Sequence, residues 1–290
     1  MSAVRKGTLA FHLSVPWLAA SAAFVLASFA LLIRTLLFVL SELSGKSVPF
    51  LIAARIWFIS NLGKYIPGKV WQILQMGLMF EEQGIDALTS GMAAVINAGV
   101  NVACGVAVAV VAGAPIFDRI LGPYGYAWLS KGVAVAAVIC VALLPSLLPP
   151  AFRIAHAKLG VAVPLERPPT RAIIVAAVAN VIAWILYGAA FKCLVRGVLG
   201  DAPGNLIDYT AAFAASYVVG YLAIFVPGGI GVREGVLIAV LVAGGLATSP
   251  EAAAISVASR LWLVVIEIVP ALLFLAYRRR PRNETTPAAG

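Results

Sequence analysis

Charged residues are scarce in this sequence, and histidine and cysteine are scarcer still. Only 11% of the 290 residues are charged, whereas 62% are hydrophobic, and soluble domains carry about 25% charged residues. This composition excludes a soluble globular protein. The three cysteines lie in separate apolar stretches without CxxC spacing, and the two histidines stand far apart. We therefore expect neither a disulfide framework nor a bound metal.

The sequence also lacks the motifs of common catalytic and nucleotide-binding sites. It contains no GxSxG and no HExxH. The glycine-rich segment GGIGVREG lacks the lysine of a Walker A loop, and no strand precedes it. We expect no enzyme activity, no cofactor and no direct use of ATP. The net charge of +9 is spread between apolar runs, so it is expected to orient the chain in a membrane rather than to bind nucleic acid.

Apolar runs long enough to cross a bilayer dominate what is present. A spanning helix needs about 20 apolar residues, and five uncharged or nearly uncharged runs reach this length, at 15–40, 88–113, 126–149, 172–191 and 252–277. We expect an all-α polytopic membrane protein with about seven or eight spanning or re-entrant helices. These form a single integral membrane domain over 1–280. The polar tail 281–290 is expected to be disordered.

Two further apolar regions, 48–80 and 209–246, are interrupted by a Pro-Gly pair. In both interruptions an aromatic residue is followed by an apolar residue, a proline and a glycine. This shared order indicates a weak internal repeat with halves at about 15–113 and 171–277. The residues around the first interruption are Asn61, Lys64, Pro67, Gly68, Lys69 and Gln72. Those around the second are Pro227, Gly228, Gly229, Gly231, Arg233 and Glu234.

Such interruptions predict a cavity inside the membrane. Irregular backbone at membrane depth survives only where protein or water covers it. Transporters built from inverted repeats place broken helices at the bilayer midplane, where the helix ends face a substrate. We therefore expect both breaks to lie within the membrane and to face a common cavity. The alternative is two ordinary loops at the membrane interface.

The cations beside the breaks are candidates for binding a lipid phosphate. Glycines let backbone amides approach a phosphate, and Lys64, Lys69 and Arg233 supply positive charge. The alternative is that these side chains extend to lipid headgroups as anchors, which we favour for Lys64 alone. For Arg233, the competing interpretation is a structural ion pair with a carboxylate. We expect Arg233→Ala to impair translocation of an anionic lipid, with Lys only a partial substitute.

Arg260 and Glu267 place opposite charges in a single apolar segment. They are seven residues apart, which puts them on one helical face about two turns apart. A charge at bilayer depth costs about 2.5 to 3.5 kcal/mol. We therefore expect Arg260 to face protein and to pair with Glu234 or Glu267. The alternative to such a structural pair is substrate binding by Arg260.

Amides and tryptophans within the apolar runs have less specific interpretations. Asn97 and Asn101 are one turn apart, and we expect them to bond neighbouring helices, with a polar cavity lining as the alternative. The tryptophans are interpreted as interfacial anchors. They are Trp17, Trp57, Trp71, Trp128, Trp184 and Trp262.

The segments NLGKYIPGKVW and VPGGIGVREGVL, with SVASRLW further on, resemble the flippase-like family named after the membrane region of lysylphosphatidylglycerol synthase. The resemblance covers almost the whole chain. It implies a bundle of about seven or eight spanning or re-entrant helices that moves lipids between leaflets.

We therefore expect a flippase or scramblase for an anionic lipid, which is either a phospholipid or a polyprenyl-phosphate-linked sugar. The alternatives are a membrane-embedded transferase with Glu234 or Glu267 as base, and a non-catalytic partner of a glycosyltransferase. Expected partners are membrane lipids, a second copy of the chain or a glycosyltransferase. The basic residues of 150–170 and of YRRRPR predict a cytoplasmic C-terminus in a bacterial inner membrane.

Overall fold

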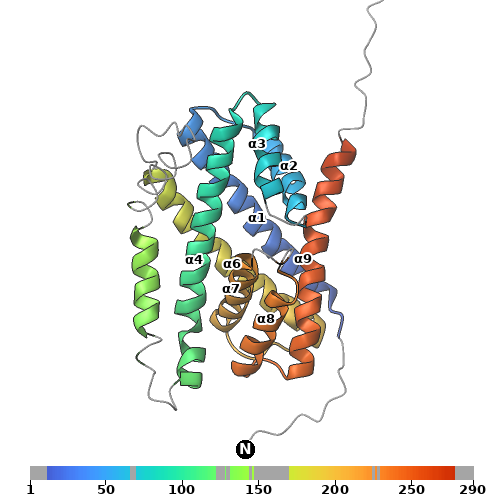
Figure 1. Cartoon of the computed structure of the whole chain (residues 1–290). Coiled ribbons are helices and arrows are strands. Elements are labelled where there is room, and N and C mark those ends of the chain that lie inside the picture. The colour runs from blue at the N-terminus through green and yellow to red at the C-terminus, as the bar shows by residue number, and fades with distance from the viewer. Residues whose placement is uncertain are drawn as a thin grey trace, which may run out of the picture.

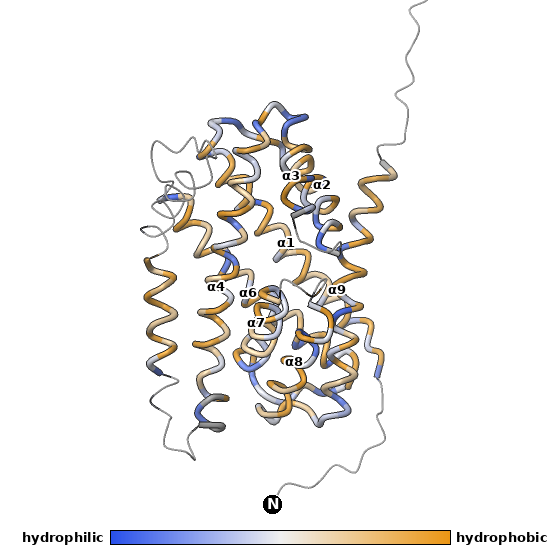
Figure 2. The backbone as a smooth tube through the Cα atoms, in the orientation of Figure 1, coloured by the Kyte–Doolittle hydropathy of each residue, from blue (hydrophilic) through white to orange (hydrophobic). Residues whose placement is uncertain are grey.

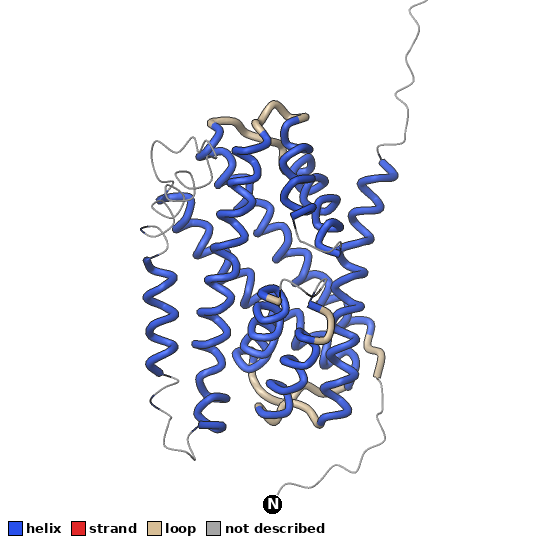
Figure 3. The backbone as a smooth tube through the Cα atoms, in the orientation of Figure 1, coloured by secondary structure: helices blue, strands red, loops and turns tan. Residues whose placement is uncertain are grey.

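Helices make up nearly all of the described chain. The computed structural model describes residues 12–65, 70–121, 131–143, 170–223 and 229–277, together with Trp128, Ser146 and Val226. Within these residues there is no strand, and short turns join the helices at the two ends of the bundle (Figure 3). The all-α polytopic fold predicted from the sequence is confirmed.

Four helices of the described chain are long and apolar enough to cross a membrane. They are α1 (Val15–Ser44), α4 (Ala87–Leu121), α6 (Thr170–Leu199) and α9 (Ser249–Tyr277). Each contains one of the predicted spans at 15–40, 88–113, 172–191 and 252–277. For the fifth predicted span, 126–149, the described helix is the shorter Lys131–Leu143.

The two interrupted regions form pairs of short helices. The first pair is α2 (Phe50–Asn61) and α3 (Val70–Glu81), with the 3-10 turn η1 (Leu62–Tyr65) between them. The second pair is α7 (Leu206–Leu222) and α8 (Val232–Ala243). Helices of 12 to 17 residues rise about 18 to 26 Å, less than the hydrocarbon thickness of about 30 Å. Neither pair therefore consists of two full spans.

The two helix pairs enter the bundle from opposite ends. The turns that flank α2 and α3 lie at the same end of the bundle as the C-terminus of α9, and the turns that flank α7 and α8 lie at the other end (Figures 1 and 3). The inner ends of both pairs point toward the middle. Pro67, Gly68, Lys69, Pro227 and Gly228 lie outside the described residues.

α1 and α6 pack against each other along the centre of the bundle. The contact face of α6 carries small residues, among them Ala172, Ala176 and Ala183, which are completely buried. Ser28 of α1 donates a hydrogen bond to the carbonyl oxygen of Ala183 at 3.4 Å. Small residues allow two helices to approach closely where lipid provides no hydrophobic driving force.

The opposite face of α6 carries large apolar residues that are exposed. Ile174, Val178 and Ile182 are each about half exposed. Figure 2 shows apolar residues along most of each helix, with hydrophilic ones gathered in the turns and at mid-height near the hairpin ends. An apolar outer surface with small or polar residues inside suits a lipid environment.

Two of the tryptophans interpreted as interfacial anchors are core residues instead. Trp184 is 1% exposed and Trp57 is 9% exposed. The indole Nε1 of Trp184 donates a hydrogen bond to the carbonyl oxygen of Asn101 at 3.1 Å, which satisfies its one polar group inside the bundle. The anchor interpretation is therefore wrong for both residues.

Candidate functional site

A cavity of about 230 Å³ lies at the centre of the bundle, where the inner ends of the two hairpins meet the long helices. Its lining combines polar and aromatic side chains. The polar members are Asn61, Lys64, Gln72, Asn97, Asn101, Arg233, Arg260 and Glu267. The aromatic members are Phe29, Trp57, Trp184, Tyr187, Tyr217 and Tyr221. Residues far apart in the sequence and predicted as site residues therefore share one cavity.

The first hairpin is closed by a glycine and an amide pair. A Cβ at Gly63 of η1 would lie 2.9 Å from the backbone nitrogen of Gln72, so only glycine permits this approach. Across the same gap, the amide Nε2 of Gln72 donates a hydrogen bond to Oδ1 of Asn61. These contacts fix Lys64 of η1 at the cavity wall.

That lysine forms an ion pair with the last long helix. Nζ of Lys64 lies 2.6 Å from the carboxylate of Glu267 on α9. The side chains of Lys64 and Glu267 are 24% and 8% exposed, and both line the cavity. The interpretation of Lys64 as a headgroup anchor is therefore wrong, because a carboxylate inside the bundle holds its ammonium group.

Glycines shape the start of α8 in the second hairpin. Gly229 and Gly231 have φ angles of 69° and 81°, in the left-handed region that glycine adopts without strain. A Cβ at Gly229 would lie 2.5 Å from the carbonyl oxygen of Gly220. α8 therefore begins in direct backbone contact with α7.

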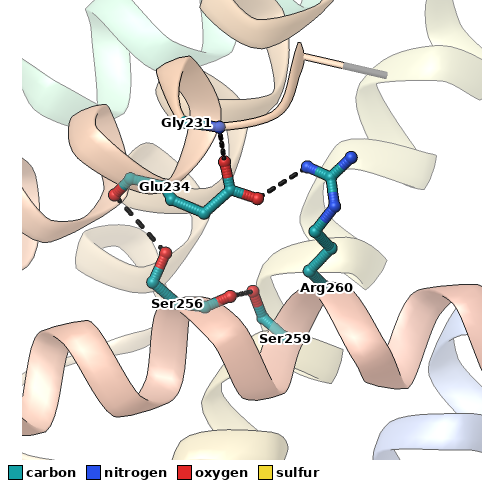
Figure 4. A network of polar contacts seen from close by, with 5 residues as sticks. All are labelled: Gly231, Glu234, Ser256, Ser259 and Arg260. Carbon is teal, nitrogen blue, oxygen red and sulfur yellow. Dashed lines mark hydrogen bonds and ion pairs between the residues drawn. The ribbon is translucent and has the colours of Figure 1, made fainter. Parts of the chain in front are cut away.

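Glu234 joins this hairpin to α9 (Figure 4). Its Oε2 accepts a hydrogen bond from the Gly231 backbone N–H at 2.6 Å, which caps α8. Its Oε1 accepts a hydrogen bond from Nη1 of Arg260 at 2.6 Å, and Ser256 Oγ donates to its carbonyl oxygen at 3.4 Å. The predicted pairing of Arg260 with a carboxylate is confirmed, with Glu234 as the partner.

Arg233, the residue before Glu234, lines the cavity. Its guanidinium carbon lies 5.3 Å from the Phe213 ring centroid and 5.2 Å from that of Tyr217. These are cation–π distances. Nη2 of Arg233 is buried, and no group in the described chain accepts a hydrogen bond from it. No ion pair joins Arg233 to a described carboxylate, so the interpretation as a carboxylate-paired residue is wrong.

The two asparagines of α4 differ in their bonding. Nδ2 of Asn101 donates to Oδ1 of Asn180 on α6 at 2.6 Å, as expected for an interhelical amide. Oδ1 of Asn97 is buried and accepts no hydrogen bond from the described chain. Both residues line the cavity, so the alternative of a polar lining is confirmed for both.

The sequence reasoning missed the tyrosines of the cavity. Tyr217 and Tyr221 lie one turn apart on α7 and both line it. Tyr187 stacks on Phe213 with ring centroids 5.4 Å apart. The spacing of Tyr217 and Tyr221 just before the second break could have indicated a shared face. The partner of Arg233, in contrast, depends on tertiary packing.

A bundle of apolar helices around a polar cavity, with two helical hairpins entering from opposite ends, defines a polytopic integral membrane protein. Residues 3–282 match the family described as the lysylphosphatidylglycerol synthase TM region. The chain belongs to this family, which points to a function connected with membrane lipids. No curated protein matches the sequence.

Proposed function

We propose that the protein translocates an anionic lipid between leaflets, with the headgroup passing through the central cavity and the acyl chains staying in the bilayer. Arg233 carries this proposal. A buried guanidinium nitrogen without an acceptor in the described chain is costly, and Arg233 lines a cavity of about 230 Å³. A phosphate oxygen would satisfy it, and a guanidinium can bind phosphate through two parallel hydrogen bonds.

The arrangement of the hairpins supports a transport path rather than a simple binding site. Both halves of the chain run through a long helix, a pair of short helices and a second long helix, and the pairs enter from opposite ends (Figure 1). We interpret this as an inverted repeat of 15–113 and 171–277. In such transporters, rocking of one repeat against the other exposes a midplane site to each side in turn.

The ion pairs provide a physical basis for such a movement. α9 is tied to the first hairpin through Lys64–Glu267 and to the second through Glu234–Arg260. A lipid phosphate that enters the cavity would compete with these carboxylates for Lys64 and Arg260. The same pairs occupy both carboxylates proposed as the base of a transferase, so we propose transport and no transfer chemistry.

We also propose that the C-terminus is cytoplasmic and that the membrane is a bacterial inner membrane. The turn between α1 and α2, which contains Lys46, and the start of α6, which contains Arg171, lie at the end of the bundle where α9 finishes (Figure 1). The C-terminal segment YRRRPR follows α9. Lys and Arg concentrate on the cytoplasmic side of bacterial membrane proteins.

Translocation of a fluorescent anionic phospholipid in vesicles containing purified protein tests this function. We expect Arg233→Ala to reduce the rate about ten- to a hundredfold, because a charge-assisted contact worth about 1.5 to 3 kcal/mol is lost. Arg233→Lys should recover part of the rate. Arg34→Ala is the control, since Arg34 is exposed on α1 and lies over the Phe50 ring. Wild-type flux from folded Arg233→Ala protein would contradict the proposal.

A further inference from the structure

The carboxylate of Glu267 lies inside the bundle among cations and phenols. Glu267 is 6% exposed, and both of its oxygens lie 2.6 Å from Nζ of Lys64. Among the described residues that line the cavity it is the one carboxylate. Its titratable and charged neighbours on that lining are Lys64, Tyr187, Tyr217, Tyr221, Arg233 and Arg260. The described parts of α1, α2, α3 and α4 contribute only uncharged side chains to the lining.

An anionic lipid in this cavity would stand beside Glu267. The volume of about 230 Å³ is below the roughly 300 to 1,000 Å³ of most small-molecule sites, so a phosphate bound by Arg233 cannot be far from the carboxylate. A phosphate that also contacts Lys64 takes the described partner of Glu267. Two anions that share a buried site do not both stay ionised readily. Beside a phosphodiester the carboxylate is the stronger base, so lipid binding favours a neutral Glu267.

A proton on Glu267 removes this conflict. The ammonium group of Lys64 is then available to a phosphate oxygen, and the carboxyl O–H becomes a hydrogen-bond donor to the same phosphate. The proton comes from water on the side where the lipid enters and returns to water where the lipid leaves, and the ion pair with Lys64 then forms again. A metal cation would need several oxygen ligands instead, and Lys64, Arg233 and Arg260 would repel it.

The other ion-paired carboxylate, Glu234, is held in a different way. Its Oε2 accepts a hydrogen bond from the Gly231 backbone N–H at 2.6 Å, at the N-terminus of α8, where the helix dipole favours a negative charge. Glu234 is not among the described residues that line the cavity. It therefore keeps a stabilising contact when Arg260 moves, whereas Glu267 depends on cations that a lipid phosphate also attracts.

We propose that the protein moves one proton together with each anionic lipid, with Glu267 as the proton-binding residue. This inference rests on the proposed function and adds its driving force. A singly charged lipid and a proton are together electrically neutral, so the pH difference across the membrane drives their movement and the voltage does not. A difference of about one pH unit then supports up to about tenfold accumulation of the lipid on the alkaline side.

The test uses sealed vesicles that contain purified protein and phosphatidylglycerol with a fluorescent acyl chain. The buffers inside and outside differ by about one pH unit, and valinomycin with equal potassium on both sides removes any voltage. A membrane-impermeant quencher measures the label in the outer leaflet. Relative to protein-free vesicles, we expect up to about tenfold more label in the leaflet on the alkaline side. Without the pH difference the label should be even.

Glu267→Gln is the decisive variant, because glutamine has the shape of a protonated glutamate and cannot exchange a proton. Under the same pH difference we expect an even distribution of label, whatever the rate at which it is reached. Glu267→Asp keeps a carboxyl group and should retain the accumulation at a lower rate. Glu42→Gln is the matched control, since Glu42 is exposed near the end of α1, and it should accumulate the lipid as the wild-type protein does.

A pH-sensitive dye in the vesicle lumen gives a second measurement that needs only the wild-type protein. Labelled lipid added to the outer leaflet should acidify the lumen as it moves inward. Movement of lipid without this acidification overturns the inference. Accumulation on the acid side, accumulation that follows a sodium gradient instead, or accumulation by Glu267→Gln also overturns it. An even distribution reached at a rate that depends on Arg233 overturns the inference and leaves the proposed function standing. No movement of lipid overturns both.

Discussion

At the scale of single residues, opposite charges inside the bundle are arranged in pairs that join different elements. Arg260 and Glu267 lie on one face of α9, yet each pairs with a residue of a different hairpin. The cost of burying an isolated charge explains why each has a partner. It does not explain which partner, because that depends on where the hairpins pack.

The pair of Arg260 and Glu234 is open to a double-mutant test. The two side chains are 20% and 18% exposed, so the pair is intermediate between a surface and a buried ion pair. A surface pair contributes about 0 to 1 kcal/mol to stability, and breaking a buried pair costs about 3 to 5 kcal/mol. We expect Arg260→Met to destabilise the protein by about 1 to 3 kcal/mol, because it strands a carboxylate. Adding Glu234→Gln should restore part of the loss. Thermal unfolding in detergent measures this, and a double variant no more stable than Arg260→Met would argue against the pair.

Sequence reasoning reached part of this residue chemistry. The pairing of Arg260 could be predicted because a guanidinium in hydrocarbon is too costly to leave alone. The partner of Lys64 could not, since Glu267 lies 203 residues away and no local pattern links them. The roles of Trp57 and Trp184 were misjudged because an indole can satisfy its N–H inside a bundle as well as at an interface.

At the scale of elements, glycine contacts hold the second hairpin closed. A Cβ at Gly220 of α7 would lie 2.7 Å from the Cβ of Arg233 on α8. That atom is fixed to the backbone and cannot rotate away. The position of Arg233 in the cavity therefore depends on the absence of a side chain at Gly220.

We expect Gly220→Ala to push α8 away from α7, lower the thermal stability and reduce lipid flux together. Gly235→Ala is the control within α8, because a Cβ there meets nothing within 4 Å and alanine favours a helix over glycine by about 1 kcal/mol. It should keep or raise the stability. Equal melting temperatures for the two variants would show that the close contact of α7 and α8 has no energetic importance.

The Pro-Gly pairs allowed both hairpins to be predicted as broken helices, since proline removes a backbone donor and glycine weakens a helix. The glycines that close the hairpins, Gly63 and Gly220, precede those motifs and were missed. Their role follows from the distance to a second helix, which a single sequence does not contain.

At the scale of the whole molecule, the long spans were the most predictable feature because membrane thickness fixes their length. The side of the membrane for the N-terminus was not predictable, since it depends on whether each broken region crosses or returns. In the structure both hairpins return to the end from which they enter (Figures 1 and 3). The start of α1 and the end of α9 lie at opposite ends of the bundle (Figure 1).

This arrangement predicts which turns face each side of the membrane. With a cytoplasmic C-terminus, Glu82 in the turn after α3 is cytoplasmic, and Asp201 in the turn after α6 is on the outer side. In a variant without native cysteines, a membrane-impermeant thiol reagent should label Asp201→Cys on intact cells and Glu82→Cys only after lysis. Labelling of both on intact cells would place the two turns on the same side of the membrane and contradict this arrangement.

The most direct test of the account is to fill the cavity and measure lipid flux. Ala98 of α4 lines the cavity, and Val95 of the same helix faces outward. We predict that Ala98→Trp reduces flux of the anionic lipid to the rate of protein-free vesicles, whereas Val95→Trp leaves it at the wild-type rate. Thermal unfolding identifies folded protein, and Ala98→Phe provides a smaller step. Wild-type flux from folded Ala98→Trp protein would contradict the central claim that lipid headgroups cross through this cavity.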